Sequence, residues 1–260
     1  MKKEERYKFF KSKIDKYRNP NCKQCRGMGL IPTSLLQKNK EAEFKECDCR
    51  IKLFRIKKLI LANIPKRSYN LLDKKLKKRT VGNLLTGKSV QLYSSVIRRY
   101  IMNYKEAVDN GIGMIFFGNP GTGKTVGALY LIIKLLQKGI DCYYIYFKDL
   151  MGLLYTTYNF PEKAPLFKEI IGVDVLVVEE LSLIGRITPH MVAEFLSICK
   201  QRFEDGKPTI LISNYSTTEE IEKNFGAPME SLMNEAFIPF RFRGRDLRED
   251  KYDYLKKFFT

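Results

Sequence analysis

The chain has 260 residues, of which 44% are hydrophobic, and a formal net charge of +18. This length is enough to bury a complete α/β core and to leave a small additional module. No apolar run approaches the roughly 18 residues of a membrane span, and the first residues lack an apolar signal core. We therefore expect a cytoplasmic protein with no membrane partner.

The positive charge is concentrated in the N-terminal third. Residues 1–80 hold 25 Lys and Arg against 8 Asp and Glu, whereas residues 81–260 hold 22 against 21. The densest part is the run at residues 74–79. This asymmetry predicts contact with an acidic partner, either nucleic acid or an acidic protein surface. A solubilising linker that binds nothing specific is the simpler alternative.

Two stretches carry apolar residues at helical spacing and predict amphipathic helices with packing faces. The first stripe is Tyr7, Phe10, Ile14 and Tyr17. The second, which precedes the core, is Val90, Tyr93, Ile97, Tyr100 and Tyr104.

Four of the six cysteines lie in the basic third, as Cys22 and Cys25 and, after 21 intervening residues, Cys47 and Cys49. In a cytoplasmic chain, such clustering favours a metal over disulfides. Four thiolates around one ion are typical of a closed, structural Zn²⁺ site, and an iron–sulfur cluster is the main chemical alternative. Because the second pair is separated by one residue instead of two, Cys22 and Cys25 are the stronger ligand candidates.

Residues 118–125 match the phosphate-binding pattern GxxxxGK[ST] at every fixed position. An apolar run precedes them and an Ala-, Leu- and Ile-rich helical stretch follows, which is the strand, turn and helix order that the motif requires. We expect Lys124 to reach the β- and γ-phosphates of ATP and the Thr125 hydroxyl to bind Mg²⁺. The residues predicted to bind the nucleotide are Gly118, Asn119, Pro120, Gly121, Thr122, Gly123, Lys124 and Thr125.

A second predicted strand, at residues 173–178, ends in Glu179 and Glu180. Because open α/β sheets bind their ligands at the carboxyl ends of parallel strands, we expect Glu179 on the metal side and Glu180 to orient or activate the attacking water. The metal-side residue is usually Asp, so the longer Glu179 predicts slow hydrolysis. A third strand, at 208–213, ends at Asn214, which is placed to contact the γ-phosphate or the water.

Together these segments resemble an AAA+ ATPase with Walker A, Walker B and sensor 1 motifs in order, and more specifically bacterial or phage helicase loaders of the DnaC/DnaI type and the related IstB ATPases. Further segments of the same likeness are residues 62–67, 201–203 with 207–209, and 244–248. The resemblance covers about residues 60 to 250. It implies that Arg248, which matches the closing Arg of the family, contributes to catalysis.

The resemblance implies an α/β fold with a mostly parallel sheet and a small helical zinc-binding N-terminal domain. We expect residues 1–60 to form this basic domain, 61–88 the linker and the start of the core, and 89–260 the ATPase domain. Residues 227–235 contain no Arg, although the family usually carries a trans-acting one there. Because such a residue supplies much of the rate, inefficient hydrolysis by self-assembled rings is expected.

The leading functional hypothesis is a loader that binds ATP, Mg²⁺ and single-stranded DNA, grips a DnaB-type hexameric helicase through its N-terminal domain, and assembles on it as a ring or spiral. A transposition helper ATPase of the IstB type is a second hypothesis. A third is a nucleotide-gated helicase adaptor or inhibitor with little turnover.

Overall fold

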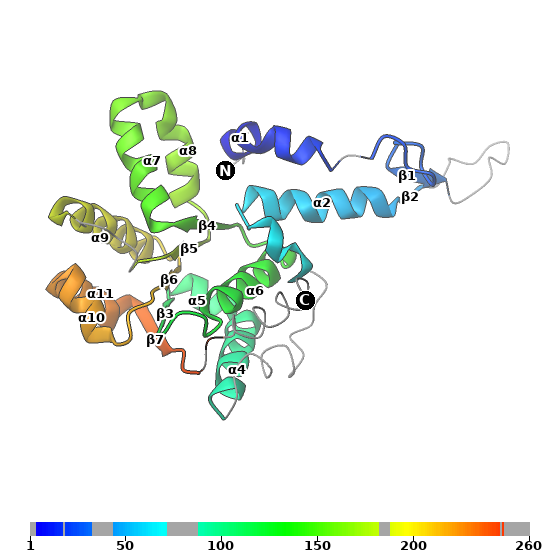
Figure 1. The fold of residues 1–260 in the computed structure, drawn as a ribbon. Coiled ribbons are helices and arrows are strands. Elements are labelled where there is room, and N and C mark those ends of the chain that lie inside the picture. Colours follow the sequence, from blue (N-terminus) through cyan, green and yellow to red (C-terminus); the bar gives the residue numbers. More distant parts are fainter. Residues whose placement is uncertain are drawn as a thin grey trace, which may run out of the picture.

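The computed structural model describes residues 4–17, 19–32, 44–71, 88–181, 188–244 and 246. Within them, an α/β core carries an arm of two helices and a small sheet that projects to one side (Figure 1). The basic run at 74–79, residues 72–87 of the predicted linker and core start, and Arg245 and Arg248 lie outside the described residues. In the described part of the chain, no helix is long and apolar enough to cross a membrane.

The core is built on a sheet in which every described strand pair is parallel, in the order β4-β5-β6-β3-β7. The strands are β3 (Gly113–Phe117), β4 (Cys142–Tyr146), β5 (Val175–Glu179), β6 (Thr209–Ile212) and β7 (Phe237–Arg241). Strands β3 and β5 are apolar runs buried along their whole length, as expected for a parallel sheet covered on both faces. The predicted α/β class with a mostly parallel sheet is confirmed.

Helices cover both faces of this sheet because alternate strand residues point to opposite sides. In β3, Ile115 and Phe117 belong to one hydrophobic cluster, and Met114 and Phe116 to the other. The second cluster lies under α4 (Lys88–Met102), α5 (Tyr104–Asp109) and α6 (Lys124–Gln137). The first lies under α7 (Phe147–Asn159), α8 (Ala164–Ile171), α9 (Pro189–Glu204), α10 (Thr218–Phe225) and α11 (Ala227–Ala236), with the short 3-10 helix η2 (Pro161–Lys163) joining α7 to α8.

The arm consists of α1 (Glu4–Asp15), the antiparallel pair β1 (Leu30–Pro32) and β2 (Phe44–Glu46), and α2 (Asp48–Leu61), and the 3-10 helix η1 (Lys66–Leu71) leads on from it. Most residues of both predicted stripes lie on α1 and α4, although Tyr17 follows the end of α1 and Tyr104 begins α5. Phe10 and Ile14 of α1 are buried, as are Ile97 and Tyr100 of α4. The side chains of Val90 and Tyr93 lie outside the described part of the chain.

The end of α2 is joined to the free edge of the sheet. The backbone N–H of Tyr144 in β4 donates to the carbonyl of Ala62 at 3.0 Å, and the Asn63 side-chain amide donates to the carbonyl of Tyr144 at 2.9 Å. Ile60 packs in one hydrophobic cluster and Leu59 in the other. The boundary expected near residue 60 therefore falls in the last turn of a helix that is packed into the core.

Arg6 fastens α1 to the core through a buried set of charges. Its Nε donates to Glu169 Oε1 at 3.2 Å, and its two terminal nitrogens donate to the Asp141 carboxylate. Glu169 Oε2 also accepts the backbone N–H groups of Glu5 and Arg6, so that a carboxylate lies at the positive end of α1. Arg6 and Glu169 are almost fully buried, so neither charge is solvated by water. The attraction between the two charges offsets the free-energy cost of removing each of them from water.

Replacing Arg6 with Ala is expected to lower the free energy of unfolding by about 3 to 5 kcal/mol, since it leaves the Glu169 carboxylate buried without its counter-charge. Urea unfolding followed by circular dichroism measures this loss. Lys8→Ala on the same helix removes only an exposed pair with Glu5 and is the matched control. Equal midpoints for the two variants would contradict this account of how α1 is held.

Candidate functional site

The loop at 118–125 joins β3 to α6 and has the backbone that a phosphate-binding turn needs. Gly118 has a φ of +126°, and a Cβ there would lie 2.2 Å from the Phe242 carbonyl oxygen, so only glycine fits. Gly123 is left-handed, with a φ of +94°, immediately before α6 begins at Lys124. The first N–H groups of this helix therefore face the loop, where they and the helix dipole favour an anion.

Lys124 lies inside the loop. Its side chain is 4% exposed, and Nζ donates to the carbonyls of Gly118 at 2.6 Å and Asn119 at 2.7 Å. The Thr122 hydroxyl closes the same turn by donating to the Asn119 carbonyl at 2.8 Å. The loop thus holds a positive charge at its centre, surrounded by backbone.

The Thr125 hydroxyl donates to Glu179 Oε1, which joins the first turn of α6 to the carboxyl end of β5. The other carboxylate oxygen, Glu179 Oε2, is buried and has no hydrogen-bond partner among the described residues. Burial raises the pKa of Glu179 above its ordinary value, and the neighbouring Glu180 charge raises it further, against the lowering effect of the Thr125 hydrogen bond. A buried carboxylate oxygen beside a threonine hydroxyl is a donor set that suits Mg²⁺.

Glu180 and Asn214 lie at the same edge of the sheet as the loop. Glu180 follows β5 in a left-handed conformation with a φ of +64°, and Asn214 comes two residues after the end of β6, the strand between β5 and β3. A non-glycine residue with positive φ is uncommon and is found at functional sites. The sheet order therefore brings together both predicted strand-end positions.

Two further residues of this edge have no role in the sequence-based hypothesis. Arg67, in η1, favours the charged form of Glu179 and so lowers the pKa of that carboxyl, although it precedes Thr125 by 58 positions in the chain. The Asp246 carboxylate lies against the loop at Gly121. A Cβ added to Gly121 would lie 1.9 Å from Asp246 Oδ1. Spacing along the chain gives no signal for either. Arg248, the remaining predicted catalytic residue, is outside the described residues.

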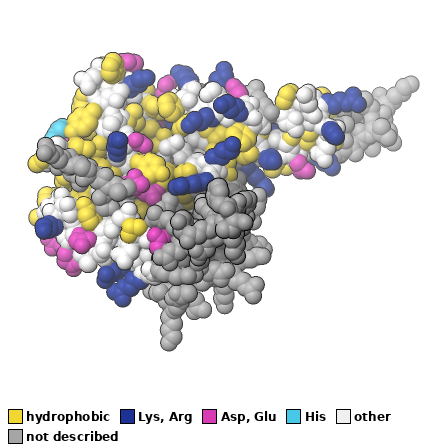
Figure 2. Space-filling view, viewed as in Figure 1, with side chains coloured by type: hydrophobic (Ala, Val, Ile, Leu, Met, Phe, Trp, Pro, Cys, Tyr) yellow, Lys and Arg dark blue, Asp and Glu magenta, His cyan; other side chains and the backbone are white. Residues whose placement is uncertain are grey.

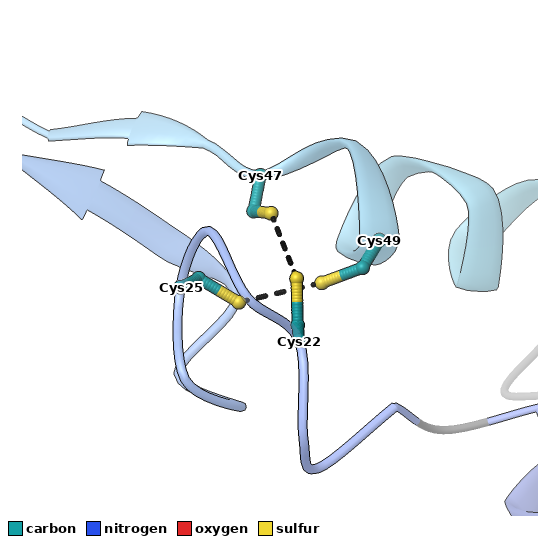
Figure 3. Close-up of side chains that lie close together, drawn as sticks. All are labelled: Cys22, Cys25, Cys47 and Cys49. Carbon is teal, nitrogen blue, oxygen red and sulfur yellow. Dashed lines mark hydrogen bonds between the residues drawn. The ribbon is translucent and has the colours of Figure 1, made fainter.

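The four clustered cysteines converge at the outer end of the arm (Figure 3). Cys22 and Cys25 come from the turn before β1, Cys47 precedes α2, and Cys49 lies in its first turn. All four sulfurs lie within 4.8 Å of one another, with Cys22 to Cys47 at 3.7 Å and Cys25 to Cys49 at 3.4 Å. Sulfurs at the corners of a tetrahedron around Zn²⁺ lie about 3.8 Å apart. The residues present therefore fit one four-coordinate ion.

Backbone hydrogen bonds prepare the cluster for a cation. Those from Cys25 and Gln24 lower the pKa of the Cys22 thiol to about 6. Thiol hydrogen bonds from Cys25 and Cys47 raise the pKa of Cys49. One thiolate is thus favoured at neutral pH, and a bound divalent ion would favour the ionised form of the others.

The fold is similar to that of three solved structures. The DnaC helicase loader superposes with a TM-score of 0.59 at 23% identity, over 69% of this chain and 100% of that one. DnaI gives 0.52 at 18% identity, over 70% and 93%. A putative primosome component from Streptococcus pyogenes serotype M3 gives 0.50 at 20% identity, over 72% and 93%. No family model and no curated protein sequence matches the chain. The predicted likeness to DnaC and DnaI is confirmed at the level of fold.

Proposed function

We propose that this protein is an ATP-dependent loader that binds a DnaB-type hexameric helicase and single-stranded DNA and delivers the helicase during the initiation of DNA replication. The observation that carries the proposal is the hydrogen bond from Thr125, the last residue of the 118–125 loop, to Glu179. This contact lies in a core whose fold is similar to that of the DnaC helicase loader. A phosphate loop by itself indicates only nucleotide binding. The combination of loop, strand-end acids and this particular fold favours loading.

In the proposed reaction, loop amides and Lys124 hold the β- and γ-phosphates of ATP. Thr125 and Glu179 hold Mg²⁺, which when bound neutralises charge on the phosphates. Glu180 orients the attacking water and accepts its proton, and Asn214 positions the water or the γ-phosphate. Arg248 remains a proposed contributor from the closing segment.

Turnover is proposed to be weak or dependent on a partner. Helix α11 (Ala227–Ala236), where the family carries its trans-acting Arg, contains none, and the described arginines nearest to it, Arg241 and Arg243, are exposed at the end of β7. The same observation favours the second candidate function, a nucleotide-gated adaptor or inhibitor that binds ATP and hardly hydrolyses it. Phosphate release that is strongly stimulated by helicase and single-stranded DNA would exclude the adaptor.

The N-terminal arm is proposed to grip the helicase, with the cysteine cluster holding Zn²⁺ as a structural ion. The arm projects to one side of the core (Figure 1), which supports a role in contacting a partner. Self-association on the helicase, as a ring or spiral, completes the proposal.

Size-exclusion chromatography with a purified DnaB-type helicase tests the loader. We expect co-elution that is stronger with an ATP analogue than without nucleotide, and Lys124→Ala is expected to retain binding through the arm but to lose the nucleotide dependence. Absence of co-elution under both conditions would contradict loading. If the protein instead bound a transposase encoded by an adjacent gene, this result would favour the IstB-type transposition helper.

Metal analysis tests the cysteine cluster. We expect about one Zn²⁺ per purified chain, lost in Cys25→Ser together with the protease resistance of the arm, because a closed Zn²⁺ site contributes its binding energy to folding. Cys199→Ala, which changes a buried cysteine of the core, is the control and should keep the ion. Iron with visible absorbance, or a metal-free protein, would overturn the zinc assignment.

A further inference from the structure

One side of α2 carries a row of three residues whose central member is an exposed aromatic side chain that the packing of the core does not explain. Arg50, Phe54 and Lys58 are spaced four residues apart, so their side chains follow one another along the helix. We call them the α2 stripe. At 1.5 Å per residue the stripe is about 12 Å long.

Phe54 is the unusual member, because it is 58% exposed while other apolar residues of the same helix, Ile56, Leu59 and Ile60, are buried. The Lys58 ammonium lies 4.8 Å from the centre of the Phe54 ring. Lys58 Nζ also donates to the carbonyl of Leu136 at the end of α6, which fixes the cation beside the ring and joins the stripe to the core. The result is a flat aromatic surface held in position beside a positive charge.

At its outer end the stripe meets the cysteine cluster. The Arg50 side chain packs over the turn of the first cysteine pair, since a Cβ on Gly29 would lie 3.1 Å from Arg50 Cδ. Arg50 Nε contacts Glu46 at 3.5 Å, but both side chains are more than half exposed, so this pair is weak and open to a competing anion. The cluster thus fixes where α2 begins, and with it where Arg50 points.

The surroundings of the stripe are basic. In residues 19–32 and 44–58, eight Lys and Arg stand against two acidic residues, and Figure 2 shows Lys and Arg side chains spread over this part of the surface with apolar side chains between them. The cations are Lys23, Arg26, Lys45, Arg50, Lys52, Arg55, Lys57 and Lys58; the acids are Glu46 and Asp48. Clustered cations attract phosphates, and an exposed aromatic ring among them is a surface on which an unpaired base stacks.

We propose that the α2 stripe binds single-stranded DNA, with Phe54 stacking on a base and Arg50 contacting a phosphate. This inference rests on the proposed function, and it places the DNA contact on the arm instead of on the nucleotide-binding core. Stacking is favoured over an acidic protein surface because an acidic surface would use the cations but has no need of an exposed, cation-flanked ring. Binding is expected to be tolerant of sequence, since every base has a stacking face.

Fluorescence anisotropy with a labelled oligothymidylate and full-length protein, in the presence of ATP and Mg²⁺, tests the stripe. Phe54→Ala is expected to weaken binding by about tenfold through the loss of one stacked base. Arg50→Gln is expected to lower the slope of log affinity against log salt by about 0.7, the value for one phosphate contact to a single strand. Zinc content and circular dichroism confirm that the arm of each variant is intact.

Two matched variants serve as controls. Phe9→Ala removes a phenylalanine of similar exposure, 63%, from the other helix of the arm, and Lys200→Gln removes an exposed cation from α9 on the core. Both should bind DNA as the wild type does.

Wild-type affinity in Phe54→Ala and Arg50→Gln would overturn the inference while the loader proposal stands. Stripe variants that keep DNA binding but lose co-elution with helicase would identify the stripe as a protein-docking surface. A wild-type chain that binds no DNA would refute both the inference and the DNA part of the proposed function.

Discussion

The hydrogen bond between Thr125 and Glu179 joins the two halves of the proposed nucleotide site, and the remaining assignments depend on it. It connects the helix that follows the phosphate loop with a strand two places away in the sheet. Because β6 lies between β3 and β5, the contact forms only if all three strands end at the same edge, as the parallel pairing ensures. The second oxygen of Glu179, Oε2, lies at this junction and has no hydrogen-bond partner among the described residues. A cation bound there would give this buried acceptor a partner.

The arm is coupled to this site through contacts at both of its helices. Arg6 holds α1 against α8, and residues 62–63 after α2 pair with the free edge of β4. From that edge the chain continues into η1, where Arg67 acts on the Glu179 carboxyl. A partner that pulls on α2 would therefore act on a segment that leads directly to Glu179, the proposed metal-side carboxylate. This continuity gives the proposed loader a physical connection between the arm and the nucleotide.

Local patterns predicted much of the fold and of the candidate site. The 118–125 loop, the two acids at the end of β5 and the two pairs of cysteines are each local patterns that depend on backbone geometry or ligand spacing, so the order of residues reveals them. A Thr followed by Pro, as at Thr188 and Pro189, is likewise a local pattern typical of a helix start, and in the structure Thr188 caps α9 by accepting the Met191 N–H at 3.2 Å.

Contacts between distant segments could not be predicted in this way. Arg6 lies on a lysine-rich helix, and nothing in its neighbours distinguishes it from an exposed cation, although it is buried against Glu169 and Asp141. Arg202, noted only as part of a family-like segment, is buried among backbone carbonyls at the starts of β5 and β6, where loss of water lowers its pKa to about 10. Such residues are specified by the packing of whole elements, which periodicity does not encode.

Isothermal titration calorimetry with ATP, with and without Mg²⁺, tests the central claim most directly. The account predicts saturable binding by the wild-type chain, loss of that binding in Lys124→Ala, and in Glu179→Gln a loss of the additional affinity that Mg²⁺ provides. Identical titrations for the wild type and Lys124→Ala, or a Mg²⁺ effect that survives in Glu179→Gln, would contradict it.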